Sequence, residues 1–334
     1  VSLHPYRANV ARGHLPVEQK GYGYTTPMEN RALELGVTFL TETPAQSLIV
    51  ENGVVVGVNA VDATGANVTI RADAVILCTG GYANNTDLIR RIHPKNDLFN
   101  GAGAPGSTGD AMLLASEFGA CIVNGDNAQC YIRDYDAVNS KIGGWTIYVG
   151  ANGERFMDET LMVTTFNQAI MQAVNHRMHE DGTDYIWLLN DQAAMDLYKP
   201  SRPDGMEYIQ ADTIEGLAEA MGVEGSALKA TVDRWNQMVE QEADDDFGRT
   251  SKFVKIETPP FYAVKGKPGA VITYGGVLRN EKSEVVKVNG DIIPGLYVAG
   301  EAAAAANANG WTVSHAITWG RIAGQNAGAY AAGK

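Results

Sequence analysis

The pattern of apolar and polar residues in the first part of the chain predicts one short helix followed by closely spaced strands. Apolar residues at helical spacing favour a helix over residues 26–35. Short apolar or alternating runs then favour strands over residues 37–40, 45–51, 54–61 and 67–71. Turn signals at Asn52-Gly53 and Thr64-Gly65 separate the later strands, which is typical of an antiparallel meander.

The pattern changes character near residue 122. Before it, a buried strand over residues 74–78 ends in a Thr-Gly-Gly turn, and an amphipathic helix begins at Asp110. After it, strands are predicted over residues 123–133, 145–149, 184–189 and 285–288, and one helix over residues 164–179. Ser226 is a good N-cap for a further helix, because apolar residues at positions 228, 232, 235 and 239 share one face.

The C-terminal stretch carries the strongest pattern. Residues 296–299 predict a short strand stopped by Gly300 and Glu301, and a loop of alanine, asparagine and glycine continues to Gly310. A helix begins near Thr312, with small residues on one side. This arrangement presents free N–H groups and a positive helix end, which suits the electron-rich edge of a flavin ring. The alternative interpretation is a surface hairpin with a packing helix.

Composition and charge argue against nucleic-acid binding, membrane-spanning and metal-binding functions. The 334 residues allow two domains, and the net charge of −13 argues against a nucleic-acid surface. No apolar run approaches the ~18 residues of a membrane span, so we expect a soluble protein, either bacterial-type cytoplasmic or exported. The three cysteines and six histidines lack metal-ligand spacing, so we expect no metal.

Several segments together resemble one family. Gly-Leu-Tyr-Val-Ala-Gly-Glu (295–301) and Gly-Trp-Thr-Val-Ser-His-Ala-Ile-Thr-Trp-Gly-Arg-Ile-Ala-Gly (310–324) resemble the closing segment of the fumarate reductase/succinate dehydrogenase flavoproteins. Residues 72–81, 105–119, 153–159 and 259–263 match further family segments in order. The family also includes urocanate reductases and 3-ketosteroid dehydrogenases. The resemblance implies an FAD-dependent oxidoreductase acting on CH–CH groups.

The resemblance also implies a fold and a set of cofactor contacts. We expect an α/β protein in which a partial Rossmann-like FAD domain, residues 1–122 and 269–334, carries an inserted α+β capping (clamp) domain, residues 123–268. The residues expected to bind FAD are Thr79, Gly80, Gly81, Thr108, Gly109, Asp110, Gly300, Glu301, Thr312 and Val313. We expect the 79–81 turn, Glu301 and the helix start at Thr312 to surround one groove.

An opening strand followed by the family's Gly-x-Gly-x-x-Gly turn is absent at the start of this sequence; the same glycine spacing at residues 101–106 runs into the segment 105–119, which matches a later family segment. We therefore expect these residues to be a fragment of a longer protein. The strand at residues 74–78 should then have an unpaired edge, which a second copy in a homo-oligomer could cover.

The positions that clamp a dicarboxylate in fumarate reductases are replaced here. Tyr131, Val163, Ile272 and Asn307 stand where the resemblance places a histidine, an arginine, a histidine and an arginine. A dicarboxylate would lack its counter-charge. The expected substrate is instead a small molecule that is neutral and flat or apolar, with Tyr131, Tyr274 and the backbone N–H of Gly310 as catalytic groups.

The leading hypothesis is an enzyme that reduces or desaturates a carbon–carbon bond next to a carbonyl or aromatic group. One rival is a fumarate-type reductase with a rearranged anion site at Arg133 or Arg155. A rival from another class is a cofactor-free fragment that serves as a folded scaffold or binds a partner. A structural hydrogen bond is expected for His315. The electron donor and the direction of reaction stay open.

Overall fold

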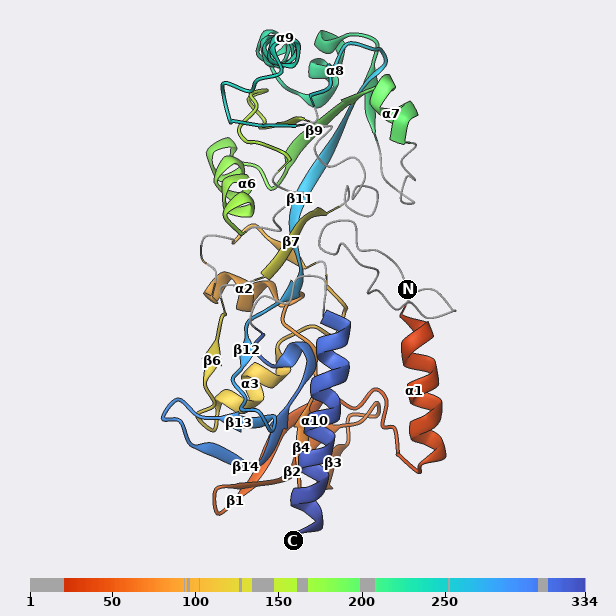
Figure 1. The fold of residues 1–334 in the computed structure, drawn as a ribbon, viewed down its shortest axis with the longest axis vertical. Helices are drawn as coiled ribbons and strands as arrows, with labels where there is room; N and C mark the ends of the chain where they lie inside the picture. The colour runs from red at the N-terminus through yellow and green to blue at the C-terminus, as the bar shows by residue number, and fades with distance from the viewer. Residues whose placement is uncertain are drawn as a thin grey trace. The chain divides into compact units, whose positions relative to one another are not determined.

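The computed structural model describes residues 21–92, 94, 97–101, 103–125, 128–133, 147–160, 168–198, 208–251, 253–305 and 312–333. Contacts divide the chain into two compact units, one of residues 1–47 and 59–70 and the other of residues 48–58 and 71–334. Within the described ranges, helices are mixed with several small sheets, which confirms the predicted α/β class (Figure 1).

The early helix and strands form largely as predicted. Helix α1 spans Tyr22–Glu34, and strands β1 (Ala45–Glu51), β2 (Val54–Val61) and β3 (Asn67–Arg71) follow in one sheet in the order β1-β2-β3. The strand predicted over residues 37–40 is wrong, because these residues join no ladder. A short apolar run becomes a strand only where a neighbouring strand supplies its hydrogen bonds.

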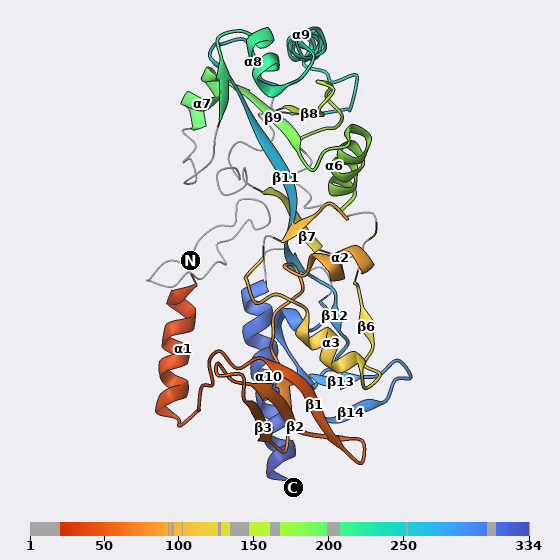
Figure 2. The ribbon, with the colours of Figure 1, turned by 180° about the vertical axis from the view of Figure 1, so that it is seen from behind.

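A second sheet carries the C-terminal strand and helix. Strands β13 (Glu284–Val286), β14 (Ile292–Val298) and β4 (Val75–Leu77) lie in this order, and β14 runs parallel to β4 with Tyr297 opposite Ile76. Helix α10 (Thr312–Ala332) packs Ala323 and Ala327 against Tyr297 and Ala299, and it lies beside β4 and β14 in both views (Figures 1 and 2).

Strand β4 ends this sheet in the described part of the chain. Ile76, at its centre, is 36% exposed although it lies in an apolar run of the kind that parallel sheets bury. This agrees with the expected unpaired edge beside residues 74–78.

Short elements connect this sheet to the rest of the larger unit. They are α2 (Thr86–Ile92), α3 (Asp110–Ser116), β6 (Ile122–Val123), β12 (Gly276–Val277) and the 3-10 turn η2 (Gly300–Ala302). β6 pairs with β12, and α3 buries Ala111, Met112, Leu114 and Ala115 in the core. Of the strand predicted over residues 123–133, residues 123 and 128–133 lie in strands and residues 124–125 do not, while residues 126–127 fall outside the described part of the chain.

One long strand organises the middle of the chain. β11 (Phe261–Thr273) pairs along its first half with β9 (Ile186–Asp191) and β10 (Ile209–Ala211), and along its second half with β7 (Ala128–Arg133) and β5 (Asn100–Gly101). β8 (Ile147–Val149) extends the sheet beyond β9. Figure 1 shows β11 running from β9 to β7. The predicted boundary at residue 268 falls inside β11, and the three-part division stays a prediction.

Four helices accompany this sheet in the described chain: α6 (Gln168–Asp181), α7 (Gln192–Tyr198), α8 (Ile214–Met221) and α9 (Gly225–Gln241). α9 buries Leu228, Val232 and Trp235 as predicted, but its cap differs. Glu224, not Ser226, accepts the capping hydrogen bond, from the N–H of Ala227 at 2.8 Å. A carboxylate one residue before the helix competes well for this role because it also interacts with the positive helix end.

A buried ion cluster ties α9 to the 153–159 segment. Glu159 accepts hydrogen bonds from Arg155 (2.8 and 2.9 Å) and from Arg249 (3.0 Å), and Asp244 accepts one from Arg155 at 2.8 Å. Both guanidiniums also lie over the ring of Trp235. Burial alone would lower the pKa of Arg155, but Glu159 and Asp244 raise it above its ordinary value. Each guanidinium of the cluster therefore has a carboxylate partner, although Nη1 of Arg155 is buried without a hydrogen bond among the described residues.

Replacing Glu159 should destabilise the protein strongly. Glu159→Gln leaves two buried guanidiniums without their shared carboxylate, and we expect the free energy of unfolding to fall by about 3–5 kcal/mol. The matched control is Asp233→Asn, because Asp233 pairs with Lys229 on the exposed side of α9. This change should lower the free energy of unfolding by under about 1 kcal/mol. Urea unfolding at pH 7 measures both. Equal effects would contradict the structural role of the cluster.

Candidate functional site

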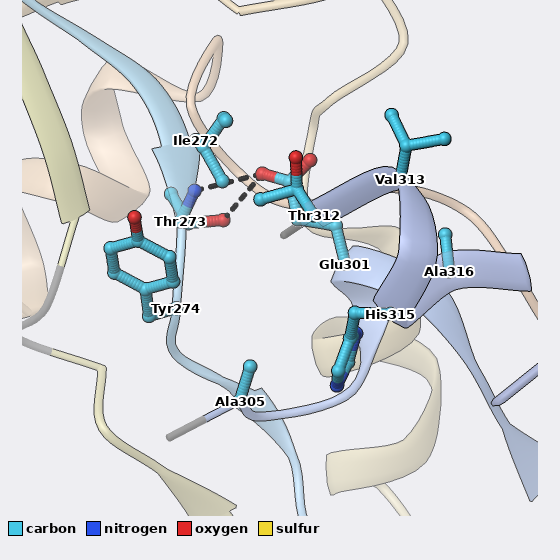
Figure 3. A pocket seen from close by; sticks show the side chains of 9 residues that line it. All are labelled: Ile272, Thr273, Tyr274, Glu301, Ala305, Thr312, Val313, His315 and Ala316. Carbon is cyan, nitrogen blue, oxygen red and sulfur yellow. Dashed lines mark hydrogen bonds between the residues drawn. The ribbon is translucent and has the colours of Figure 1, made fainter. Parts of the chain in front are cut away.

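A pocket of about 230 Å³ lies between the end of β11 and the start of α10 (Figure 3). Its polar lining comes from Thr273, Tyr274, Glu301, Thr312 and His315. The remaining lining side chains are small or aliphatic: Ile272, Ala305, Val313 and Ala316. Tyr274 lies on the β11 side of the pocket and His315 on the α10 side. The lining therefore suits a largely apolar ligand with a few polar atoms.

Glu301 is the acidic side chain of this pocket. Its Oε1 accepts hydrogen bonds from the backbone N–H of Thr273 at 2.8 Å and from the Thr273 hydroxyl at 3.1 Å. Burial raises the pKa of Glu301 although both hydrogen bonds act to lower it. Within the described residues, Oε2 makes no hydrogen bond. Among the described residues, the carboxyl group is thus held through one oxygen only.

Gly81 makes this arrangement possible. A Cβ at Gly81 would lie 2.1 Å from the Thr273 hydroxyl and 2.3 Å from Oε1 of Glu301, so no other residue fits without displacing both. The neighbouring N–H of Tyr82 donates to the Thr273 hydroxyl at 3.2 Å. The turn at residues 79–81, the end of β11 and Glu301 therefore meet at one point.

The same turn holds the start of α3. The Thr79 hydroxyl accepts a hydrogen bond from the N–H of Ala111 at 3.1 Å, and the carbonyl of Gly81 accepts one from Gly109 at 2.9 Å. Thr108 donates to the carboxylate of Asp110 at 2.7 Å. Gly80 and Gly109 have φ values of +74° and +84°, a conformation that favours glycine. The sequence segments 79–81 and 108–110 thus form one connected unit.

The start of α10 completes the site. Thr312 and Val313 line the pocket together with Glu301, and Gly300, with φ +68°, turns the chain before η2. Gly81 abuts Glu301, and Glu301 shares the pocket with Thr312, but none of residues 79–81 lines this pocket, so the single groove expected around all three segments stays a prediction. That these residues bind a cofactor is taken up as a proposal below.

The expected substrate residues are only partly described. Tyr274 is 4% exposed and lines the pocket beside Ile272. Tyr131 lies on β7 opposite Gly269 of β11, and its side chain is outside the described part of the chain. Gly310, Val163 and Asn307 also fall outside the described residues.

Arg155 does not offer the anion site of the fumarate-type rival. Its side chain is 5% exposed, and Glu159 and Asp244 already bind its guanidinium. A substrate carboxylate would have to displace one of these buried carboxylates. The side chain of Arg133, the other residue in that hypothesis, lies outside the described part.

The sequence analysis did not predict a role for Arg279, a cation near the pocket. Arg279, between β12 and β13, places Nη2 3.2 Å from Nε2 of His315 and its guanidinium 3.2 Å from the ring centre of Trp319. The expected structural hydrogen bond of His315 is thus present. The spacing of His315 and Trp319, four residues apart on one helix, was an available signal for a shared partner.

Two expected absences can be stated for the described residues alone. No group of three or more histidine, cysteine, aspartate or glutamate side chains is arranged to hold a metal ion in these ranges. None of the described helices is long and apolar enough to cross a membrane.

Comparison with known proteins places the chain among flavin-binding proteins. It is 28% identical to the NADH:acrylate oxidoreductase of Vibrio harveyi over 97% of this chain and 34% of that protein. A flavocytochrome c3 fumarate reductase in its open conformation matches with a TM-score of 0.80 and 27% identity, over 96% of this chain and 58% of that one. A 3-ketosteroid dehydrogenase of Rhodococcus jostii, in complex with 4-androstene-3,17-dione, matches with a TM-score of 0.67 and 26% identity. The match covers 95% of this chain and 64% of that one.

The chain spans 34–58% of the length of the first four curated relatives it matches. The family model described as "FAD binding domain" matches residues 6–314. That match includes the 79–81 turn, the start of α3, Glu301 and the start of α10. This chain belongs to the FAD binding domain family.

Proposed function

We propose that this chain is the FAD-binding and substrate-binding part of an oxidoreductase that reduces or desaturates a carbon–carbon bond next to a carbonyl or aromatic group. The observation that carries the proposal is the meeting of Gly81, Thr273 and Glu301 beside the start of α10. It supports a cofactor site because Glu301, which Gly81 abuts, lines one pocket together with the start of α10.

The residues present fit FAD. Gly81 and the small lining residues Ala305 and Ala316 leave room for the cofactor to approach the backbone closely. Glu301 would accept a hydrogen bond from a cofactor hydroxyl through Oε2, and Thr312 and Val313 would hold the cofactor at the helix start. Thr79, Gly80, Thr108, Gly109, Asp110 and Gly300 would support these contacts. When bound, FAD supplies hydride chemistry.

We further propose a substrate that is neutral and flat or apolar, with Tyr274 handling the proton. The side chains of Ile272 and Tyr274 carry no charge into the pocket. Arg279 contacts the ring of Trp319 and the lining residue His315. The Rhodococcus relative binds such a ligand, a ketosteroid. Tyr131 and the N–H of Gly310 are further candidates on the substrate side.

Cofactor binding tests the proposal through one glycine. Gly81→Ala should weaken FAD binding by about tenfold to a hundredfold, because the new methyl group displaces Glu301 and Thr273. Gly106→Ala is the matched control, since no atom lies within 4 Å of a Cβ there. Titration of the FAD absorbance and fluorescence gives both affinities. A wild-type protein that binds no FAD would favour the scaffold alternative, and equal affinities in the two variants would remove Gly81 from the site.

Substrate choice tests the second part. The FAD-loaded protein should reduce an α,β-unsaturated ketone or a vinylarene and should not reduce fumarate, when driven by a reduced viologen dye. Tyr274→Phe should lower the rate by about 10²–10⁴-fold, because it removes the hydroxyl and keeps the ring. Tyr262→Phe is the control, because its hydroxyl contacts Gln192 in the β9–β11 region. Efficient fumarate reduction, or full activity of Tyr274→Phe, would contradict the proposal.

A further inference from the structure

Arg279 carries a charge that no carboxylate of the described chain balances. Its Nε is buried without a hydrogen-bond partner among the described residues, and none of their carboxylates lies within ion-pair distance of its guanidinium. Its neighbours are the ring of Trp319 and Nε2 of His315. Burial lowers the pKa of Arg279 to about 10, which still leaves the group charged at neutral pH. The contrast with Arg155, which two carboxylates bind, is clear.

The contact with Arg279 determines the tautomer and the protonation of the His315 imidazole. A guanidinium can only donate hydrogen bonds, so Nε2 of His315 must accept and the ring proton resides on Nδ1. Burial, followed by the charge of Arg279, lowers the pKa of His315. A neutral imidazole therefore separates the guanidinium from the pocket, and His315 itself lines that pocket.

The position of Arg279 and His315 determines which part of the pocket their electrostatic field reaches. His315 lies in the first turn of α10, where the positive end of the helix dipole points toward the same pocket. Glu301 is the acidic group among the lining residues, and Oε1 of that group is already bound to Thr273. Tyr274 lines the pocket at the end of β11. The positive end of α10 and the Arg279–His315 pair thus lie on one side of the pocket, while the β11 side offers the hydroxyl groups of Thr273 and Tyr274 and the carboxyl group of Glu301, whose pKa burial raises.

We propose that Arg279, acting through His315, is a positioning residue that holds a positive charge against this pocket and favours the reduced, more negative form of a bound flavin. The proposal rests on the proposed function, since it takes FAD as the occupant. Positive charge near a flavin ring is one of the means by which a protein adjusts the electron affinity of that cofactor. Trp319 keeps the guanidinium in place by cation–π contact.

The first experiment uses the protein without FAD. NMR titration of the histidine ring signals, assigned with His315→Asn, should give a pKa for His315 below its ordinary value. Arg279→Gln removes the charge and should raise that pKa, whereas Arg279→Lys retains the charge and should raise it less. Arg321→Gln, an exposed site on the same helix, should leave it unchanged. An unchanged pKa in Arg279→Gln overturns the coupling of the two residues.

The second experiment measures the midpoint potential of bound FAD by reductive titration against a reference dye. Arg279→Gln should weaken the reduced form relative to the oxidised form by about tenfold, which corresponds to a potential lower by about 30 mV. Arg279→Lys should change the potential less, and Arg321→Gln should not change it.

The outcomes separate the two proposals. Equal potentials in Arg279→Gln and Arg321→Gln overturn the inference while FAD binding stands. An unchanged potential with lost binding of fumarate would assign the charge to a substrate carboxylate and also overturn it. A protein that binds no FAD fails the proposed function and, with it, the effect on flavin; the His315 titration then still decides whether Arg279 controls the imidazole.

Discussion

The close approach of Gly81 to Thr273 and Glu301 is the constraint on which the candidate site depends. These three residues come from the turn after β4, the end of β11 and the turn after β14, so the contact joins segments 191 and 28 positions apart. The absence of one side chain brings the backbone of Tyr82 to the Thr273 hydroxyl and positions the carboxyl group of Glu301. The start of α10 then closes the pocket over that carboxyl group.

The larger unit has two groups of buried charged side chains. The group around Glu159 has matched opposite charges, whereas the group around the pocket, in the part of the chain that the structure describes, does not. Around Glu159, the carboxylates and guanidiniums are matched, and Trp235 covers them, so the cluster stabilises the packing of α9. Among the described residues around the pocket, one oxygen of Glu301 has no hydrogen bond and Arg279 has no carboxylate partner. Incompletely satisfied ionisable groups are costly to bury, and they concentrate where a ligand completes them.

The local predictions succeeded where glycine and alternating patterns leave few choices. The turn at residues 79–81, the meander of β1 to β3 and the helix after Gly310 depend mostly on short-range backbone preferences. The local predictions failed where the structure of a segment depends on contacts with another segment. Residues 37–40 remain outside any ladder, and Glu224 replaces Ser226 as a cap. β11 was missed because Gly266 and Pro268 interrupt its apolar run, although β9 and β7 supply its hydrogen bonds.

By itself, the sequence determined the chemical types of the site: glycines for close approach, Glu301 as the acid, tyrosine and isoleucine in place of charged residues, and an α/β fold. The glycines and Glu301 follow from residue identity and local spacing, whereas the fold and the replacement of charged residues follow from the resemblance to the flavoprotein family. Only the tertiary structure decided which charges are matched. Arg155 is bound by two carboxylates, and Arg279 contacts His315 and Trp319 beside the pocket. The reason is that pairing depends on distances of a few ångströms between segments far apart in the chain, and spacing along the sequence does not encode them.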